Sequence, residues 1–547
     1  MTTESPTRHH SHPTAKTSTS APAPPTPSFI FRGHDAPVQA LEFFASNTFL
    51  ATGDEAGWIC VWDVWRRRQV HRWHGHPTGS VLALKAIPFR PGPENISRMV
   101  SSEPTLAVDK GRRRKSDSSG SIERQDQAYI VSHGRDNEIH VWDINTILQK
   151  SIKRADLAAA HVTPSANSQD ITPVFSLPVN ALNFCKLSIL AIEVSPRLEQ
   201  EPEISPLTGA CLLSRTHQHI YIAVPSPTTA TLLDIYDIVK PERTFASVGQ
   251  QNKSTSASAS LEADKKLGSA MAIQLFQARD EVPDSSAPCL NKDSEVTSKA
   301  LQMLVGYEDG SVTLFRESTL PATERQRPTG AGAKQKRKMD ILWTIRCHRE
   351  PVLALDISHD MQYAVSCGSD NVLARYNLAG QLQGVPEVTQ IALKSNGIAD
   401  IKIRSDNKII GLAGWDGRIR VFSAKTLKPL AVLKYHREGL YCLAFAVVRD
   451  RKPSAEGIEV EQTRATSSDE TRGGSKLSSS TTGDGDRDPG SEGNNMGESE
   501  SEGDDSGSDS DEGSDLEDAL EGRRVWSKRH WIAAGGKENR VSLWEMY

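Results

Sequence analysis

The sequence has little of several features that mark common protein classes. Only 6% of its 547 residues are aromatic and 37% are hydrophobic, below the roughly 45–50% apolar content of typical globular domains, a figure that also counts glycine. No apolar run reaches the ~18–20 residues needed to span a bilayer. The N-terminal stretch also lacks the apolar segment of a secretory signal. These absences argue against a membrane protein and against a secreted one.

Cysteine pairs and catalytic motifs are absent as well. The seven cysteines are odd in number, scattered and never spaced as CxxC, which predicts reduced, buried thiols rather than disulfides or a zinc site. No GxGxxG, GxxxxGK[ST], GxSxG or HExxH motif occurs, and nothing pairs a nucleophile with a base. We therefore predict that the chain is not an enzyme and has no catalytic, cofactor-binding or metal site.

The sequence does contain an internal repeat. Gly33-His34 leads to Val61-Trp62-Asp63, and Gly75-His76 leads to Val141-Trp142-Asp143, with short alternating apolar stretches and Gly/Asp turns between them. Weaker copies end at Phe315, Tyr376, Phe422 and Trp544, and a degenerate copy spans 220–238. Seven repeats of this kind predict an all-β fold, a single seven-bladed propeller of four-stranded blades.

Polar segments account for the rest of the length. We predict a disordered tail over 1–27 and a propeller over 28–547 with disordered inserts at about 91–127, 155–172, 195–215, 242–268, 279–299, 319–338 and 449–524. Subtracting these leaves roughly 300 residues, about 43 per blade, within the ~40–45 of such repeats. Because the sequence stops soon after the strand that reaches Trp544, Phe29–Arg32 is expected to complete the seventh blade and close the ring.

The inserts are expected mainly on one side of the ring. With strands a to d in each blade, the a–b and c–d connections share one side, and the b–c and d–a connections share the other. Most inserts fall in a–b or c–d connections. The insert at 242–268 is expected in a d–a connection and is an exception, and 155–172 is a second candidate exception. Loops tolerate insertion at small cost, so the inserts could have drifted there. The functional alternative is that the less burdened side docks a partner.

The repeats resemble the WD40 family, in which a histidine, a Ser or Thr, an Asp and a Trp form a structural hydrogen-bond set. The second repeat has the full set, and the fifth has Tyr in place of Trp. The first and seventh repeats are partial. The first has Ala56 at the Asp position, and the seventh has Glu538 at the Asp position and Ala534 at the Ser position. The matching residues are His76, Ser132, Asp136 and Trp142; His348, Ser366, Asp370 and Tyr376; His34, Thr52 and Trp62; and His436 and Trp544. Repeats three, four and six lack the histidine and are expected to be held mainly by packing.

Within the WD40 proteins, the opening segment 31–84 and the closing segment 531–547 resemble the fungal ASTRA-associated protein 1 family, which is related to the animal G-protein β-subunit-like protein 1. The resemblance implies a non-catalytic scaffold subunit of the multiprotein nuclear ASTRA complex. It also implies roles in chromatin remodelling and, with the Tel2–Tti1–Tti2 cochaperones, in maturation of PI3K-related kinases. The open alternatives are a substrate receptor of a cullin-type ubiquitin ligase and a histone-binding WD40 adaptor.

Two rival classes fit the sequence less well. Cullin receptors typically carry Arg two positions after the Trp-Asp pair, where this chain has Trp65 and Asn145. A heterotrimer-type G-protein β-subunit would need an N-terminal coiled coil, which the Pro- and Thr-rich residues 1–27 do not encode.

Charge is unevenly distributed along the chain. Thirteen acidic residues and no Lys or Arg lie in 492–521, although the formal net charge of the whole chain is only −5. This stretch cannot bury enough apolar surface to fold. It is interpreted either as a solvated loop or as a binder of basic partners such as histones, with Ser499, Ser506 and Ser508 as acid-directed phosphorylation sites.

Two basic clusters lie in the predicted inserts. They predict nuclear import and a nuclear localisation. Neither interleaves aromatic residues, so we predict no direct sequence-specific nucleic-acid binding, and nothing suggests a membrane partner. The clusters consist of Lys110, Arg112, Arg113, Arg114 and Lys115, and of Lys334, Lys336, Arg337 and Lys338.

Overall fold

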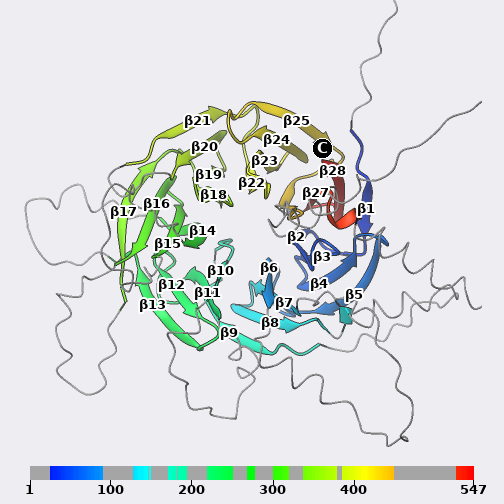
Figure 1. The fold of residues 1–547 in the computed structure, drawn as a ribbon, viewed down its shortest axis with the longest axis horizontal. Helices are drawn as coiled ribbons and strands as arrows, with labels where there is room; N and C mark the ends of the chain where they lie inside the picture. The colour runs from blue at the N-terminus through cyan, green and yellow to red at the C-terminus, as the bar shows by residue number, and fades with distance from the viewer. Residues whose placement is uncertain are drawn as a thin grey trace, which may run out of the picture. The chain divides into compact units, whose positions relative to one another are not determined.

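The strands of the described residues form seven four-stranded antiparallel sheets. The computed structural model describes residues 25–89, 127–145, 147–148, 171–181, 183–193, 218–250, 268–277, 300–318, 337–378, 385–448 and 525–546. The sheets stand around a ring, with the first strand of each blade on the inside and the last on the outside (Figure 1). The predicted all-β, seven-bladed propeller is confirmed. Within the described residues, no helix has both the length and the apolar character needed to cross a membrane.

The first four blades follow one another along the chain, each in the order a, b, c, d. Blade 1 consists of β2 (Val38–Phe44), β3 (Phe49–Asp54), β4 (Trp58–Asp63) and β5 (Arg68–His74). Blade 2 consists of β6 (Val81–Phe89), β7 (Gln127–Gly134), β8 (Glu138–Asp143) and β9 (Phe175–Pro178). Blade 3 consists of β10 (Ser188–Glu193), β11 (Gln218–Pro225), β12 (Leu233–Asp237) and β13 (Glu242–Val248). Blade 4 consists of β14 (Ala270–Gln277), β15 (Leu301–Tyr307), β16 (Ser311–Glu317) and β17 (Met339–Arg346).

The remaining blades include the one that closes the ring. Blade 5 consists of β18 (Val352–Ile357), β19 (Tyr363–Gly368), β20 (Val372–Asn377) and β21 (Val388–Ala392). Blade 6 consists of β22 (Ile398–Ile403), β23 (Ile409–Gly414), β24 (Arg418–Ser423) and β25 (Pro429–Lys434). Blade 7 consists of β26 (Leu440–Phe445), β27 (His530–Gly536), β28 (Arg540–Met546) and, from the other end of the sequence, β1 (Phe29–Arg32).

The N-terminal strand closes the propeller, as predicted. β1 pairs antiparallel with β28, from Phe29 opposite Leu543 to Arg32 opposite Arg540. Figure 1 shows β1 beside β28, between the outer strands of blades 6 and 1. Phe31 is only 1% exposed and joins the apolar cluster between blades 7 and 1. The two ends of the described chain are therefore held in one sheet, and β28 has no open edge.

The core is divided among the seven junctions between neighbouring blades, with one apolar cluster at each. Second strands such as β3, β19 and β27 are buried on both faces because a blade packs on each side of them. Their sequences are accordingly apolar or small at nearly every position rather than alternating. Outer strands such as β5 and β25 are mostly exposed. The low apolar content of the whole chain therefore does not describe this core.

Two predicted inserts need correction. Glu242–Val248, predicted to begin an insert, form β13, because Phe245 and Val248 pack into the junction between blades 3 and 4. The segment 155–172 is a c–d connection between β8 and β9, so it belongs with the majority of inserts and is not an exception. The tail 1–24 and most of the other predicted inserts, including the acidic stretch 492–521, lie outside the described residues.

The described cysteines are free, and most are buried. Cys60, Cys185, Cys367 and Cys442 are buried and Cys347 is partly exposed. Burial raises the pKa of Cys60 and of Cys442 to about 12. These thiols stay protonated at neutral pH and serve as small apolar side chains.

Candidate interaction face

The side of the ring that carries the b–c turns and d–a connections, called the b–c face below, is cross-linked by histidines. In blade 2, His76 Nδ1 lies 2.9 Å from Asp136 Oδ2, and His76 Nε2 lies 2.7 Å from Ser132 Oγ. Trp142 Nε1 donates to the same Ser132 Oγ at 2.8 Å. Because a carboxylate only accepts, His76 donates through Nδ1 and the Ser132 hydroxyl donates to Nε2. The connection that enters the blade is thus tied to its b–c turn and to strand c.

Blade 5 repeats this arrangement with a tyrosine. His348 lies 3.0 Å from Asp370 and 2.7 Å from Ser366, and the Ser366 hydroxyl lies 2.9 Å from Tyr376 Oη. The backbone N–H of Arg349 also donates to Asp370 at 3.1 Å. A carboxylate in the turn therefore fixes both the histidine and the backbone of the next residue, Arg349, which is exposed.

In blade 1 the carboxylate comes from a different position than predicted. Asp54, not the residue at Ala56, accepts from His34 Nδ1 at 2.7 Å, while Thr52 bonds His34 Nε2 and Trp62 Nε1. In blade 2 the position equivalent to Asp54 is Gly134, where an added Cβ would meet His76 Nδ1 at 2.1 Å. Asp54 stands two positions after Thr52 and so faces the same side of the strand.

In blade 7 the missing serine is replaced from the neighbouring strand. Ser542 Oγ lies 2.9 Å from His436 Nε2 and accepts from Trp544 Nε1 at 3.0 Å. Ser542 on β28 pairs directly with Ala534 on β27, the position where the serine was predicted. The hydroxyl is therefore supplied by strand c of this blade instead of strand b. Glu538 replaces Asp, 3.2 Å from His436 Nδ1. Burial lowers the pKa of His436, which keeps the ring neutral at neutral pH.

The replacement serine gives a testable result. Ser542→Ala is expected to lower the free energy of unfolding by about 2 kcal/mol, because it leaves a buried His nitrogen and a buried Trp N–H without a partner. Adding Ala534→Ser to Ser542→Ala should restore most of that loss, since the hydroxyl returns to the strand that carries it in blades 2 and 5. Urea unfolding followed by tryptophan fluorescence measures both. Equal stability of the single and double variants would show that the hydroxyl does not bridge these groups.

Blades without the histidine have other polar ties in addition to packing. In blade 6, Asp416 in the b–c turn accepts from both terminal nitrogens of the buried Arg420, at 2.9 and 2.6 Å. In blade 3, the buried Asp234 accepts from Arg243 at 2.7 Å and from the Ser247 N–H at 2.8 Å. A guanidinium–carboxylate pair thus ties the b–c turn to strand c in blade 6 and strand c to strand d in blade 3.

One group of side chains has the composition of a metal site. Ligand atoms of His76, Asp136 and His140 all lie within 4.8 Å of one another. Both His76 nitrogens, however, are already bonded to Asp136 and Ser132, and His140 Nδ1 bonds Ser176 at 2.8 Å. The His–Asp pair recurs in blade 5. The arrangement is explained by blade assembly, and a metal would have to displace it.

The b–c face also exposes aromatic side chains. Phe184, in the connection from blade 2 to blade 3, is 61% exposed, and Trp415, in the b–c turn of blade 6, is 48% exposed. The guanidinium of Arg135 lies 4.6 Å from the Phe184 ring centre. Gly397 has a φ of +77°, and an added Cβ would meet the Trp415 ring at 2.1 Å, so this glycine lets the indole lie close to the backbone. Exposed aromatic and Arg side chains are the residues most often central to protein interfaces.

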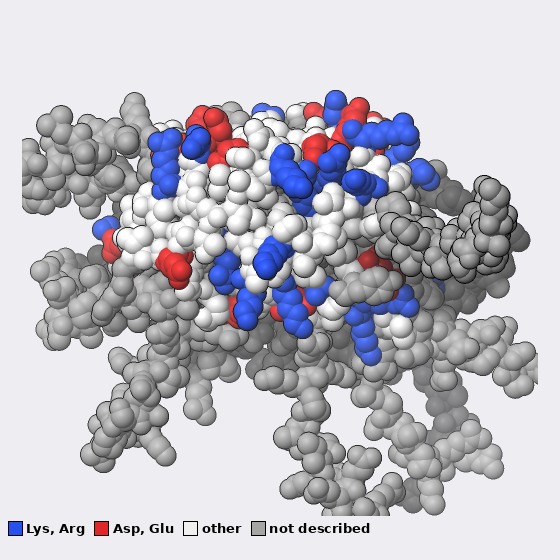
Figure 2. All heavy atoms as spheres, turned by 90° about the horizontal axis from the view of Figure 1, so that it is seen from above, with Lys and Arg blue, Asp and Glu red and all other residues white. Residues whose placement is uncertain are grey.

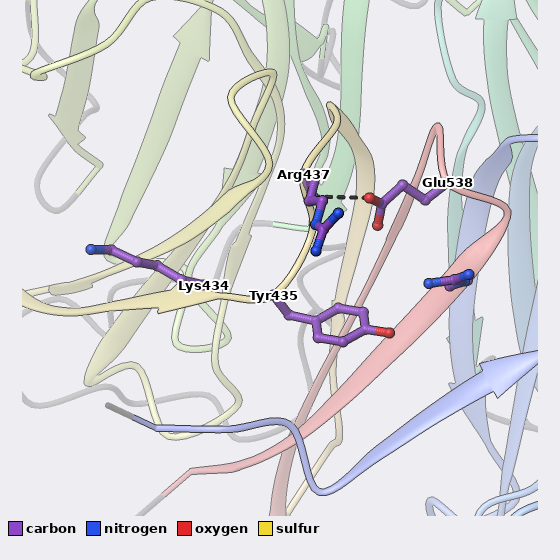
Figure 3. A pocket seen from close by; sticks show the side chains of 5 residues that line it. Lys434, Tyr435, Arg437 and Glu538 are labelled. Carbon is purple, nitrogen blue, oxygen red and sulfur yellow. Dashed lines mark hydrogen bonds between the residues drawn. The ribbon is translucent and has the colours of Figure 1, made fainter. Parts of the chain in front are cut away.

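A polar pocket opens between blades 6 and 7. It has a volume of about 620 Å³ and is lined by Lys434, Tyr435, Arg437, Glu538 and Arg540. The Glu538 carboxylate points toward the backbone of Arg437, whose backbone N–H donates to Glu538 Oε1 at 3.0 Å (Figure 3). The Tyr435 side chain points toward the side on which Arg437 and Glu538 lie, whereas Lys434 extends away from the other labelled side chains (Figure 3). The pocket combines three cations, a phenol and one carboxylate.

Four ionisable side chains from the inner strands and the connection before β10 meet at the centre of the ring, here called the axial ion cluster: Lys186, Asp400, Lys402 and Asp356. Lys186 of blade 3 reaches across to Asp400 Oδ2 of blade 6 at 3.3 Å and to the Tyr441 carbonyl of blade 7 at 3.4 Å. Lys402 Nζ lies 3.1 Å from Asp400 Oδ1. Blades 3, 6 and 7 are therefore joined by polar contacts that do not depend on neighbouring-blade packing.

The cluster shifts the pKa values of its members in opposite directions. Burial alone would raise the pKa of Asp400, but Lys186, Lys402 and the Leu443 N–H outweigh burial and lower it. Burial raises the pKa of Asp356 despite Lys402 nearby. Burial alone would lower the pKa of Lys402, but the carboxylates of Asp400 and Asp356 raise it. At neutral pH Asp400 and Lys402 are therefore both ionised.

Several residues that the sequence analysis singled out make contacts with neighbouring side chains in the structure. Of the two basic clusters, only Arg337 and Lys338 are described; Arg337 pairs with Glu317 at 2.7 Å and Lys338 with Asp340 at 2.7 Å. The others, 110–115, 334 and 336, lie outside the described residues. Trp65, at the position where cullin receptors carry Arg, packs edge-on against Trp526, with their ring centres 5.4 Å apart. Asn145 bonds Asp143 at 2.7 Å.

Comparison with known proteins supports the assignment of the repeats to WD40 repeats. The family model described as "WD domain, G-beta repeat" matches residues 25–63 and 339–375. ASTRA-associated protein 1 of Aspergillus flavus is 29% identical over 541 residues, covering 97% of this chain and 100% of that protein. The same-named protein of Aspergillus niger is 27% identical, covering 96% and 98%. Guanine nucleotide-binding protein subunit beta-like protein 1 of Mus musculus is 27% identical, covering 78% of this chain and 91% of that protein.

Proposed function

Because this chain is a WD40-repeat protein similar over nearly its whole length to ASTRA-associated protein 1, we propose that it is a non-catalytic scaffold subunit of an ASTRA-type nuclear complex. In that complex it would hold partner subunits, including cochaperones of the Tel2–Tti1–Tti2 kind, for chromatin remodelling and for maturation of PI3K-related kinases. The relatives' name supports the association with ASTRA. The histidine- and arginine-tied blades support a rigid body that presents side chains to partners.

We propose the b–c face as the partner-binding side. The single observation that carries this is the exposure of aromatic side chains there: Phe184, whose ring lies beside the Arg135 guanidinium, and Trp415, in the turn whose Asp416 binds Arg420. Such side chains lose little conformational entropy on binding and bury a large area. All but one of the predicted inserts interrupt a–b or c–d connections, so the b–c face keeps short turns.

The acidic stretch 492–521 is proposed as an accessory binder of basic partners such as histone tails. Its thirteen carboxylates and absence of Lys and Arg support this by charge alone. Nuclear import through the basic clusters at 110–115 and 334–338 is likewise part of the proposal.

Affinity purification tests this function. Tagged full-length chain recovered from nuclear extract is expected to bring down large helical-repeat cochaperones in amounts comparable to the bait. A chain deleted for 449–524 should retain them and lose histones in a salt-sensitive manner. Recovery of a cullin adaptor instead of the cochaperones would replace the proposal with the ubiquitin-ligase alternative.

A further inference from the structure

The pocket between blades 6 and 7 carries more positive charge than its own acids balance. Within the described residues, Lys434, Arg437 and Arg540 form no ion pair, although all three line the pocket and are exposed. Its one carboxylate, Glu538, already accepts from the Arg437 N–H through Oε1 and from His436 through Oε2. The neighbouring Glu438 lies 3.4 Å from Lys537. The local acids are thus committed to holding the turn or to another cation.

Strand register adds two pairs of like charges beside the pocket. Arg540 on β28 stands directly opposite Arg32 on β1. Lys434 on β25 stands directly opposite Arg418 on β24. Directly opposed residues of an antiparallel pair project from the same face with their Cβ atoms about 5 Å apart, and like charges in that position destabilise the pair. Among the described residues, Arg418 is the one of these four cations that pairs with a carboxylate: Asp416, at 3.8 Å, which also binds Arg420.

Basic side chains are also prominent on the adjoining surface. Figure 2 shows the molecule from the edge that is uppermost in Figure 1, where β21 and β25 lie. On this side, Lys and Arg side chains occur from the top to the bottom of the described surface, with Asp and Glu between them (Figure 2). What distinguishes the pocket is that three cations line one open hollow and that two of them, Lys434 and Arg540, stand opposite like charges on the neighbouring strand. Cations that follow a nucleic-acid backbone would instead form a continuous groove with stacking aromatics.

The donors match a doubly charged oxyanion. Arg437 and Arg540 present planar guanidinium groups that bond two oxygens at once, and Tyr435 adds a hydroxyl donor. A phosphorylated side chain carries about two negative charges and three acceptor oxygens at neutral pH, which is more than a carboxylate offers. Such a group would also relieve the repulsion between Arg540 and Arg32.

We propose that the blade 6–7 pocket binds a phosphorylated Ser or Thr side chain of a partner protein, with Arg437 and Arg540 as its principal ligands. This rests on the proposed function, since it assigns one recognition element to the b–c face. It adds a regulatory consequence: a kinase acting on the partner would strengthen assembly without any change in this chain.

Fluorescence anisotropy with a labelled decapeptide tests the proposal. The full-length chain at 0.15 M salt should bind a peptide with one phosphoserine among glutamates at least about tenfold more tightly than its serine or glutamate counterparts. Arg437→Gln with Arg540→Gln should abolish that preference. The matched control is Arg346→Gln with Lys394→Gln, which removes the same charge from exposed positions on other blades and should leave binding unchanged. Inorganic phosphate should compete.

Three results would overturn it. Equal affinity for the phosphoserine and glutamate peptides would show a nonspecific basic patch, as would equal losses in the pocket and control variants. Tighter binding of a single-stranded oligonucleotide than of the phosphopeptide would assign the cations to nucleic acid. These binding assays use purified chain, so a negative result in them would not affect the recovery of cochaperones from extract. Loss of that recovery would instead sink the proposed function.

Discussion

Deletion of residues 1–33 is expected to lower the thermal midpoint of the propeller by about 10 °C. The deletion removes β1, which leaves β28 with an open edge and takes Phe31 out of the junction between blades 7 and 1. Loss of one buried phenylalanine alone costs about 3–5 kcal/mol, and each kcal/mol corresponds to about 2 °C in a domain of this size. The four lost ladder positions add to this. Differential scanning calorimetry measures the change.

The matched control is deletion of residues 1–24, which leaves β1 whole. It should keep the midpoint within about 2 °C of the parent, a change that corresponds to about 1 kcal/mol. Phe31→Ala in the full-length chain should fall between the two truncations, because it retains the backbone pairing with β28. If the 1–33 deletion melts with the control, the ring does not depend on its N-terminal strand.

Replacement of Asp400 by alanine is expected to lower the free energy of unfolding by about 3 kcal/mol. Asp400 is 5% exposed and accepts from the backbone N–H of Leu443 at 3.1 Å as well as from the two lysines. Removing the carboxylate leaves a buried N–H without a partner, which costs about 1–3 kcal/mol. The lysines are about a third exposed, so solvent screens much of their share. Urea unfolding measures the difference.

The pH dependence of this effect follows from the direction of the pKa shift. The folded pKa of Asp400 lies below its unfolded value near 3.9. Its contribution is therefore fully present above that unfolded value and is lost as pH falls through the lower folded pKa. The difference between parent and Asp400→Asn should be constant from pH 5 to 8 and shrink below about pH 4. Asp356→Asn is the matched control, since burial raises the pKa of that carboxyl and its charged form is disfavoured. An equal loss in both variants would contradict the distinct role of Asp400.

The repeat pattern predicted the fold because each blade encodes its own turns and buried strands. The histidine sets of blades 2 and 5, and the closure by Phe29–Arg32, follow from sequence spacing together with the strand count. Asp54 and Ser542 did not follow from the usual positions. A hydrogen-bonding group can be supplied from any position whose side chain reaches the same point, either two residues along one strand or directly across the ladder. A search for polar residues at those equivalent positions would have found both.

Other features had no local signal at all. Lys186 and Asp400 are 214 positions apart and meet only because blades 3 and 6 lie on opposite sides of the axis. The like-charge pairs Arg32–Arg540 and Arg418–Lys434 depend on strand register, which the hydrophobic pattern of these strands does not fix to the residue. The assignment of 242–248 to an insert failed because its polar residues face solvent on an outer strand, where few apolar residues are required.

Docking of partners on the b–c face can be tested by purifying two paired variants from nuclear extract. Phe184→Ser with Trp415→Ser alters residues on that face that are 61% and 48% exposed; Leu430→Ser with Ile341→Ser alters residues that are 57% and 43% exposed on the outer strands β25 and β17. We expect the first pair to recover at least about tenfold less cochaperone than the parent, and the second pair to recover as much as the parent. Equal recovery by both pairs, or loss confined to the second, would contradict it.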